Sequence, residues 1–489
     1  MKKRLINEIK KIAVGVIAFA GILLMNNLVV EASEAEKLDT TVTISNGGAV
    51  WAVTDGSYSS SVYLYAGDTV TVTVSEGIQG IYLIWDEPVN EWTLECNGES
   101  SVQGSNGFLH DYIELDGATE FVINNDKAGN RLADIYCYGE GELPADVQIW
   151  EPMCEKADIL LLSSHADDEI LFFGSVLAQY AGQDELEVQV VYFSQYWTGA
   201  KIREHEKLDG IWHAGVRNYP FTAHFDDWYA GDFERAKTLF GYDNAVKFAV
   251  EMIRRFKPQV IVGHDLNGEY GHGTHILTAH SLTDAVTLSN DAANYPESAE
   301  QYGVHEVKKL YLHLYGDNKI KVPTRVPLDN FGGKTALEVA KESYLYHVSQ
   351  QWCWYYVDDE YEYSCADFGL YYTTVGYDTG NDMMENIIDY KTQEEMKKAE
   401  EEAQKKAEEE SIKAEEESSR QAASLEESKS IAEAEKESAK LEQDKKQNER
   451  NNVFKVVIIV LVSVVVIMLG AIVVLKTKSN TGRKKRKIK

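Results

Sequence analysis

The spacing of apolar residues changes near residue 144 and divides the first 385 residues into two regions. From about residue 38 to 143, apolar and polar residues alternate in short runs such as Thr41–Ile44, Ser61–Tyr65 and Thr69–Val74. Turns rich in Gly, Asn, Asp and Ser separate these runs, and no helical period interrupts them. The pattern is typical of strands with one buried face, so we predict an all-β sandwich of the jelly-roll type over residues 38–143.

In the second region, strand-like apolar runs alternate with helix-like segments. This alternation favours a mainly parallel sheet with helices on both faces, so we predict an α/β, Rossmann-like domain over residues 144–385. No Gly-x-Gly-x-x-Gly follows the first strand, so a dinucleotide site is not indicated. The predicted strands are Asp158–Ser163, Glu187–Ser194, Gln259–Val262 and Lys309–Leu314, and the predicted helices are Glu169–Ala181, Arg203–Ala214, Asn244–Phe256, Ile276–Leu288 and Thr335–Gln350.

Residues 392–452 consist largely of Glu, Lys, Ala, Gln and Ser, without an aromatic, Gly or Pro residue. Their apolar positions are mostly alanine and hold no sustained heptad, which argues against a strong coiled coil. We predict a charged helical stalk, about 90 Å long if it is continuous at 1.5 Å per residue. A disordered tether of the same composition is the alternative.

An unbroken apolar run, Val456–Leu475, follows the stalk and is long enough to span a membrane. Residues 476–489 then carry eight Lys and Arg residues and no acid. Because positive residues stay cytoplasmic, we predict a single-pass type I membrane protein whose larger part is extracellular. The basic and then apolar residues 1–32 predict a secretory signal peptide, with an uncleaved anchor as the alternative.

Charge and cysteine content narrow the possible partners and crosslinks. The formal net charge is −31, which disfavours nucleic acid and anionic headgroups as partners. Five cysteines in an exported chain allow at most two internal disulfides, and sequence alone does not give the pairing. Cys96 with Cys137, and Cys353 with Cys365, would each crosslink one domain locally, which leaves Cys154 over.

Two of the predicted strands end in clusters of metal-ligand residues. His-Ala-Asp-Asp-Glu occupies 165–169 after the first strand, and Tyr-Gly-His-Gly-Thr-His occupies 270–275 after the third. In open α/β sheets the carboxyl ends of strands house the chemistry, so the two clusters predict one shared metal site. Zinc accepts imidazole nitrogen and carboxylate oxygen and lowers the pKa of bound water. The expected ligands are His165, Asp168 and His275.

Two further residues lie beside these expected ligands. The side chain of Asp167 diverges from that of Asp168, which leaves it free to act as a general base. His272 would then face the substrate as an acid or oxyanion partner.

These motifs resemble those of the PIG-L/LmbE family of zinc-dependent N-acetylglucosamine de-N-acetylases, over about Asp158 to Gln350. The resemblance implies the same zinc ligands and base, with His272 stabilising or protonating the tetrahedral intermediate. It further implies that Tyr270 polarises the amide carbonyl and that Arg203 contacts substrate. Two more elements match the family pattern, Arg-x-x-Glu at 203–206 and His-Val-Ser-Gln at 347–350.

The chain departs from the family pattern at two places. Ala166 replaces the usual proline, which affects backbone stiffness. Gly273 and Thr274 replace the frequent Pro-Asp between the two histidines, so the acid that could orient or charge His272 is missing.

Several other residues admit both a functional and an ordinary structural role. His264 and Asp265 are expected in a loop or behind the ligands, and Glu169 fits the positive end of a helix as well as it fits catalysis. Arg203 could instead form a surface ion pair. Tryptophans and tyrosines could bind sugar or pack in a core; they are Trp51, Trp85 and Trp92 in the first region and Trp352, Trp354, Tyr355 and Tyr356 in the second.

The sequence thus predicts a surface-anchored zinc hydrolase that deacetylates an N-acetylated glycan or a small amino sugar. One alternative is a zinc amidase that acts on another acyl amine. A second, of a different class, is a non-catalytic glycan-binding surface protein with a degenerate deacetylase fold.

Overall fold

The computed structural model describes residues 33–480 of the chain, with side chains to residue 474. The predicted signal peptide lies outside these residues, as does most of the basic tail. The described residues up to Glu394 form one compact unit, and those from Glu395 onward form a second.

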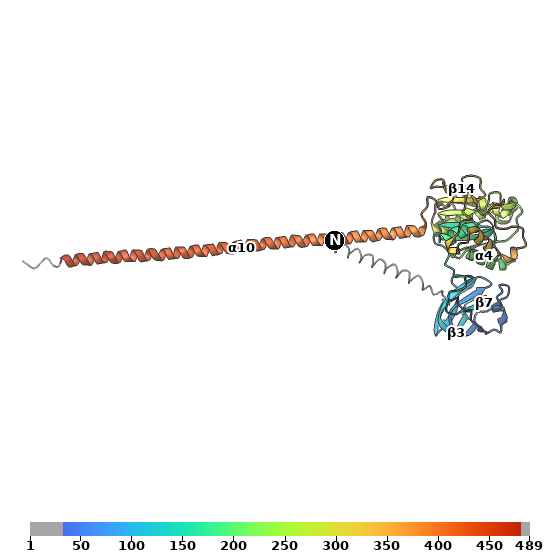
Figure 1. Cartoon of the computed structure of the whole chain (residues 1–489), viewed down its shortest axis with the longest axis horizontal. Helices are drawn as coiled ribbons and strands as arrows, with labels where there is room; N and C mark the ends of the chain where they lie inside the picture. Colours follow the sequence, from blue (N-terminus) through green and yellow to red (C-terminus); the bar gives the residue numbers. More distant parts are fainter. Residues whose placement is uncertain (1–32, 481–489) are drawn as a thin grey trace, which may run out of the picture. The chain divides into compact units, whose positions relative to one another are not determined.

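The first region is an all-β domain whose strands pair antiparallel throughout (Figure 1). The strand order is β2-β7-β3-β6-β4-β5, and β1 pairs with β3. The bounds are β1 Thr40–Ile44, β2 Val62–Leu64, β3 Asp68–Trp85, β4 Trp92–Cys96, β5 Glu99–Gln103, β6 His110–Asn125 and β7 Asn130–Tyr138.

The two long strands, β3 and β6, pair with each other along most of their length. The first half of β3 pairs with β1 and its second half with β7, and the β3–β6 register shifts between Thr73 and Gly80. Buried residues from both halves, such as Val72 and Leu83, share one apolar core. Trp85 and Trp92 lie in that core with ring centroids 5.8 Å apart, whereas Trp51 is exposed. Packing therefore accounts for two of the three tryptophans.

The second region is built on a mixed, mainly parallel sheet with the strand order β10-β9-β8-β11-β12-β14-β13. The first five strands are parallel, and β14 is antiparallel to both of its neighbours. All four predicted strands are present, as β8 Ile159–Ser163, β9 Val188–Gln195, β11 Val260–Gly263 and β12 Lys309–His313. The sequence analysis missed β10 Phe221–Asp226 and β13 Lys319–Lys321, which are the two edge strands, and β14 Asp367–Thr373, which lies between β12 and β13.

Side chains on alternate positions of β8 face two apolar layers. Ile159 and Leu161 pack with residues of the helices α2, α3, α4 and α9, whereas Leu160 and Leu162 pack with α6 and α7. Helices therefore cover both faces, as predicted. The bounds are α2 Asp168–Leu171, α3 Gly174–Val176, α4 Ile202–His213, α5 Phe233–Phe240, α6 Tyr242–Phe256, α7 Gly273–Leu288, α8 Pro296–Tyr302 and α9 Ala336–Tyr344.

Three predicted helices differ in extent. The segment predicted as one helix from Glu169 to Ala181 is broken into α2, α3 and the π-helical turn Leu177–Gln183. The helix predicted to reach Gln350 ends at Tyr344, and Val348–Gln350 forms a separate 3₁₀ turn. Helix α7 begins at Gly273, so His275 lies within its first turn and does not precede it.

The strand order decides where the two motif loops meet. Strand β8 lies between β9 and β11, so the chain leaves β8 toward one side of the sheet and leaves β11 toward the other. A topological switch point of this kind opens a crevice at the carboxyl ends of the two strands. The loops that follow β8 and β11 flank that crevice.

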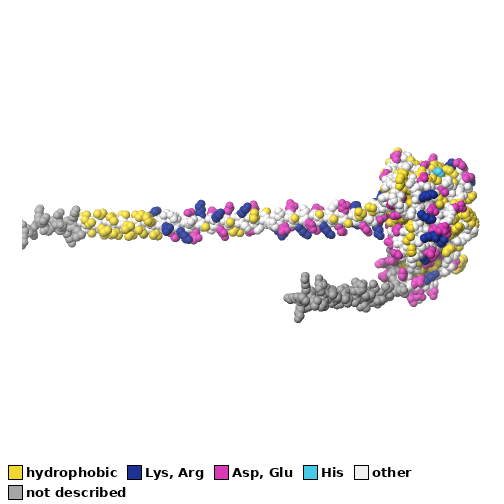
Figure 2. Space-filling model, turned by 45° about the horizontal axis from the view of Figure 1, so that its top comes forward, with side chains coloured by type: hydrophobic (Ala, Val, Ile, Leu, Met, Phe, Trp, Pro, Cys, Tyr) yellow, Lys and Arg dark blue, Asp and Glu magenta, His cyan; other side chains and the backbone are white. Residues whose placement is uncertain are grey.

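The second unit is part of one continuous helix, α10 Tyr390–Asn480. It contains an 18-residue window apolar enough to cross a membrane, and Figure 2 shows this stretch as a hydrophobic segment beyond the charged part of the helix. The predicted stalk is therefore helical in the structure.

The proposed disulfides are wrong, because all five cysteines are free in the described chain. Cys96 ends β4 and Cys137 lies in β7, and β6 and β3 separate those strands in the sheet order. Cys353 Sγ instead contacts the Tyr344 hydroxyl at 3.3 Å, while Cys365 is buried in the core of the second region.

Candidate metal centre

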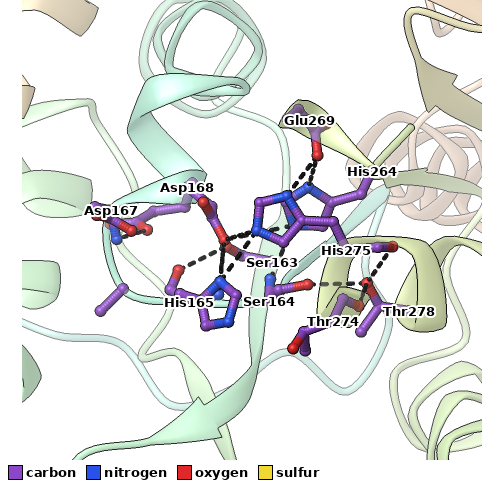
Figure 3. Close-up of polar contacts among 12 residues, drawn as sticks. Ser163, Ser164, His165, Asp167, Asp168, His264, Glu269, Thr274, His275 and Thr278 are labelled. Carbon is purple, nitrogen blue, oxygen red and sulfur yellow. Dashed lines mark hydrogen bonds and ion pairs between the residues drawn. The ribbon is translucent and has the colours of Figure 1, made fainter. Parts of the chain in front are cut away.

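The loop after β8 is held in a strained conformation by its own side chains. Asp167 has φ 134° and ψ −34°, a region that residues with a side chain rarely occupy. The backbone N–H of His165 donates to Asp168 Oδ2 at 2.9 Å, and the N–H of Asp167 donates to Glu169 Oε2 at 2.7 Å. These bonds turn Asp168 inward and leave Asp167 on a different side of the loop, as Figure 3 shows.

The three predicted ligands converge on one point (Figure 3). Asp168 Oδ2 lies 2.8 Å from His165 Nδ1 and 3.0 Å from His275 Nε2, and the two nitrogens are 3.1 Å apart. Two ligand atoms of a tetrahedral zinc are about 3.4 Å apart, so this triangle needs only a slight expansion to hold the ion. Two imidazoles and one carboxylate are also a donor set that catalytic zinc uses, and all three residues are buried.

Charge at this point favours a cation. Burial opposes the charged forms, but Asp168 and Glu269 outweigh it at His275 and raise the pKa of that imidazole to about 10. Conversely, His275 and His165 hold the pKa of the Asp168 carboxyl well below its usual range despite burial. Positive charge is therefore stabilised here, and a divalent cation can supply it in place of protons.

Behind the triangle lies a carboxylate that the sequence analysis missed. Glu269 is fully buried, and its oxygens lie 2.7 Å from His275 Nδ1, 2.8 Å from His264 Nδ1 and 2.6 Å from His313 Nδ1. A carboxylate that binds the second nitrogen of a ligand histidine fixes its ring and tautomer. Its position just before Tyr270, within the second cluster, is the signal that could have revealed it.

The hydrogen bonds of His264 place it behind the ligands. Its Nε2 accepts the Ser164 N–H at 3.0 Å and its Nδ1 lies against Glu269, so both nitrogens are engaged. Although His264, Asp168 and His275 lie close enough to form a second candidate triplet, His264 Nε2 is 3.8 Å from Asp168 Oδ2. His264 therefore supports the site and is not a ligand in this arrangement.

Asp167 has the environment of a general base. Burial raises the pKa of its carboxyl to about 7, although Arg203 acts in the opposite direction. Arg203 Nη2 lies 3.2 Å from Asp167 Oδ1 and also donates to the Ala166 carbonyl. A carboxylate with a pKa near neutrality can both take up and return a proton under ordinary conditions. Arg203 lies inside the site, so it is not the surface ion-pairing residue considered above.

The two remaining motif elements also come together. Glu206 accepts hydrogen bonds from both the backbone N–H and the hydroxyl of Ser349, each at 2.6 Å. His347 Nε2 lies 2.8 Å from Glu169 Oε1, and both side chains are fully buried. These contacts hold the His-Val-Ser-Gln element against α4 and against the loop after β8. Glu169 contributes by contacting His347.

Tyr270 and His272 reach the pocket from the other loop. Tyr270 adopts φ 50° and stacks on Tyr355 with ring centroids 4.5 Å apart. Burial, together with His165 and His275, lowers the pKa of His272 to about 2, so its imidazole is neutral. Its Nδ1 has no hydrogen-bond partner among the described residues, and neither has the hydroxyl of Thr274. A neutral imidazole can donate or accept a hydrogen bond. No carboxylate among the described residues hydrogen-bonds to His272 Nδ1 and so favours its protonated form.

Residues of both loops line one pocket of about 430 Å³. Its wall contains the ligands His165 and Asp168, and the second-loop residues Tyr270 and His272. The remaining lining residues are Asp167, Leu171, Arg203, Asp227, Tyr229, Gln350, Trp352, Cys353, Trp354 and Tyr355. The volume lies in the range of small-molecule sites.

Helix α4 connects this pocket to the β domain. One side of α4 carries Arg203 into the pocket, and another side carries His205, whose Nδ1 lies 2.9 Å from Nε2 of His110 on β6. Asp209 of α4 accepts hydrogen bonds from Tyr58 and Gln148. We call His110, His205, Asp209, Tyr58 and Gln148 the interface cluster.

Comparison with known proteins identifies the class of the second region. Residues 160–286 match the model of the PIG-L family, described as GlcNAc-PI de-N-acetylase. This segment is therefore similar to the PIG-L family, as the motifs predicted.

Among the relatives, a 1D-myo-inositol 2-acetamido-2-deoxy-alpha-D-glucopyranoside deacetylase of Rhodococcus erythropolis is 28% identical over 29% of this chain and 57% of its own length. A protein of the same name from Catenulispora acidiphila, numbered 1, is 27% identical over 31% of this chain and 54% of its own length. The chain thus spans little more than half the length of these curated relatives.

Among solved structures, the N,N'-diacetylchitobiose deacetylase from Pyrococcus horikoshii has 16% identity and a TM-score of 0.32 over 40% of this chain and 71% of that chain.

Proposed function

We propose that the protein is a cell-surface, zinc-dependent de-N-acetylase that hydrolyses the acetamide of N-acetylglucosamine-type sugars. The observation that carries the proposal is the convergence of His165, Asp168 and His275 beside Asp167, whose pKa is near neutrality. The match of residues 160–286 to a de-N-acetylase family, and the deacetylase names of the relatives, support the choice of an amide substrate.

In this proposal His165, Asp168 and His275 hold the zinc. When bound, zinc would act as a Lewis acid that polarises the acetamide carbonyl and lowers the pKa of the attacking water. Glu269 accepts a hydrogen bond from the Nδ1–H of His275, so the Nε2 atom of His275 is left to bind the metal. Arg203 keeps the carboxyl of Asp167 turned into the pocket.

Proton transfer falls to Asp167. Its carboxylate takes a proton from the attacking water as the water oxygen bonds to the acetamide carbon. It returns that proton to the sugar nitrogen as the C–N bond breaks, which yields acetic acid and the amine; in neutral water these become acetate and the ammonium form of the sugar. A pKa of about 7 suits both steps, because neither protonation state is strongly disfavoured.

Tyr270 and His272 stabilise the developing oxyanion. Both line the pocket, and a neutral His272 donates a hydrogen bond without carrying a charge of its own. Preorganised donors of this kind contribute about 10²–10³ in rate. The loss of the acid at position 274 therefore favours oxyanion stabilisation by His272 over proton donation.

The location is part of the proposal. The apolar stretch of α10 crosses the membrane once, the residues before it face outward, and the acidic stalk separates the catalytic domain from the bilayer. The substrate is then an N-acetylated glycan or amino sugar that lies outside the cell.

Acetate release by the full-length protein in detergent, assayed with N-acetylglucosamine and its β-1,4-linked oligomers, tests the activity. We expect release that a chelator abolishes and added zinc restores, and a loss of about 10²–10⁴ in kcat on Asp167→Asn. The matched control is Asp265→Asn at the end of β11, whose carboxylate bonds only within its own loop. If the protein binds zinc but releases no acetate from any N-acetyl sugar, it is a glycan-binding protein or an amidase for another acyl amine.

A further inference from the structure

Aromatic side chains from two loops extend the candidate pocket outward. Trp352 and Trp354 follow the 3₁₀ turn Val348–Gln350, and Tyr229 follows β10; all three line the pocket. Their exposed fractions are 82%, 63% and 78%. These rings therefore form the rim of the pocket, with most of their surface exposed to solvent.

Packing within the protein accounts for some side chains of this segment and not for the two tryptophans. Tyr355 stacks on Tyr270 and Cys353 contacts Tyr344, so these two side chains are occupied within the protein. Trp354 contacts Tyr355 with ring centroids 4.0 Å apart but keeps most of its surface exposed, and Trp352 is more exposed still. Holding large aromatic surfaces in water around a polar pocket is unfavourable, and such patches mark binding sites.

The chemistry of the rim indicates what it binds. Flat aromatic faces attract the slightly positive C–H groups on the faces of sugar rings. The candidate metal centre is confined to the inner pocket, so rings on the rim lie beyond the sugar that would react there. The net charge of −31 disfavours anionic polymers, and it favours a neutral glycan or one that gains ammonium groups as acetyl groups are removed.

We propose that the pocket takes an internal or terminal sugar of an N-acetylated oligo- or polysaccharide, with Trp352 and Trp354 stacking on the neighbouring sugars. This inference rests on the proposed deacetylase function and narrows its substrate to a chain. A sugar without glycosidic neighbours fills the inner pocket and leaves the rim unused.

The test measures acetate release by the full-length protein in detergent on β-1,4-linked N-acetylglucosamine chains of one to six sugars. We expect kcat/KM per chain to rise at least about tenfold from one sugar to six, because the added sugars contact aromatic rings that a single sugar does not reach. Trp352→Ala with Trp354→Ala should reduce the six-to-one ratio at least about fivefold. Trp51→Ala is the matched control, because that tryptophan is 65% exposed but lies on the β domain outside the pocket.

Equal kcat/KM for one and six sugars would overturn the proposal, as would an equal fall of the ratio in the Trp51→Ala protein. Binding of the same chains to the Asp167→Asn protein, followed by tryptophan fluorescence, separates this proposal from the deacetylase function. Length-dependent binding that is lost when Trp352→Ala and Trp354→Ala are added supports sugar binding by the rim, even if no acetate is released. Acetate release without length dependence refutes the rim and leaves the deacetylase function standing.

Discussion

The structure contains two clusters of buried histidines, and they differ in their charge environment. At the candidate metal centre, His165 and His275 face Asp168, and Glu269 lies behind His275. In the interface cluster, His110 and His205 face each other across 2.9 Å. Burial lowers the pKa of His205 to about 3 and raises that of Asp209 to about 7, so burial favours the neutral form of both groups.

The difference shows what makes buried histidines a cation site. Desolvation alone drives imidazole to its neutral form, as in the interface cluster. Only where carboxylates approach within hydrogen-bond distance does the pKa rise, as it does to about 10 at His275. The first cluster is suited to hold a cation, and the second to join the β domain to α4 by neutral hydrogen bonds and ring stacking, such as Tyr58 on His205 at 4.6 Å.

The largest expected effect comes from removing a carboxylate from the metal centre. Asp168→Asn should abolish stoichiometric zinc and reduce acetate release by more than the roughly 10–100-fold typical of residues behind the ligands. Metal analysis of the purified full-length protein measures the first, and acetate assay the second. The same change in the interface cluster, Asp209→Asn, is the matched control and should retain zinc. Zinc retention by both variants would remove the distinction between the clusters.

Glu269→Gln tests the carboxylate behind the ligands. Three histidines lose their shared charged partner, so we expect zinc affinity to fall by about 10–100-fold, as measured by competition with a chromophoric chelator. Glu204→Gln is the control, because Glu204 is equally buried but pairs with Lys207 away from the triangle. Unchanged affinity in the Glu269 variant would show that the ligands hold their orientation without it.

His205→Leu breaks the interface cluster alone. His110 Nε2 then loses its protein partner, which should lower the free energy of unfolding by about 1–3 kcal/mol while zinc content stays at the level of the unchanged protein. Denaturant titration followed by fluorescence measures the stability. His213→Leu on the same helix, where the ring is partly exposed, should change it by about 0.5 kcal/mol or less. Equal effects at both positions would contradict the buried His110–His205 bond.

The smallest expected effect is a change in how stability depends on pH. The pKa of His205 is lowered to about 3, so its contribution is present above pH 6.5 and is lost as pH falls toward 3. The pKa of Asp209 is raised to about 7, so its contribution is present at low pH and is lost as pH rises through 7. The two oppose each other between pH 4 and 6.5.

Removing one of these two groups should therefore reveal the effect of the other on the pH dependence of stability. Asp209→Asn should make the loss of stability on acidification steeper by about 1 kcal/mol per pH unit in this window, measured by denaturant titration at several pH values. The stability of the unchanged protein over the same range is the reference. Parallel curves for the two proteins would show that Asp209 does not carry a proton in the folded state.

Local pattern predicted the secondary structure where it was strong and failed where it was weak. The four central strands and the helices α4, α6 and α7 follow from apolar periodicity, because each buries a continuous face. The edge strands β10 and β13 were missed, since an edge strand needs fewer apolar residues, and β14, which lies between β12 and β13, was missed with them. The breaks that divide the Glu169–Ala181 segment, and the π-helical turn within it, were also missed.

The candidate site was predicted to a similar extent. Motif composition was enough to name His165, Asp168, His275 and Asp167, and the structure brings all four to one crevice. Glu269 was missed because its role depends on His313, which approaches from a different strand, at 2.6 Å. The disulfide proposal failed for the same reason, because spacing along the chain says nothing about how many strands separate two cysteines.

By itself the sequence determined the alternation of strands and helices, the two strand-end motifs, the charged helix and its apolar stretch, because each depends on residues close together in the chain. The tertiary structure decided that both motifs flank one switch point, that Glu269 supports three histidines, and that α4 joins the site to the β domain. It also decided which tryptophans are buried and which form the pocket rim. These depend on strand order and burial, which arise from contacts between different elements of the chain, such as His165 with His275 and His110 with His205.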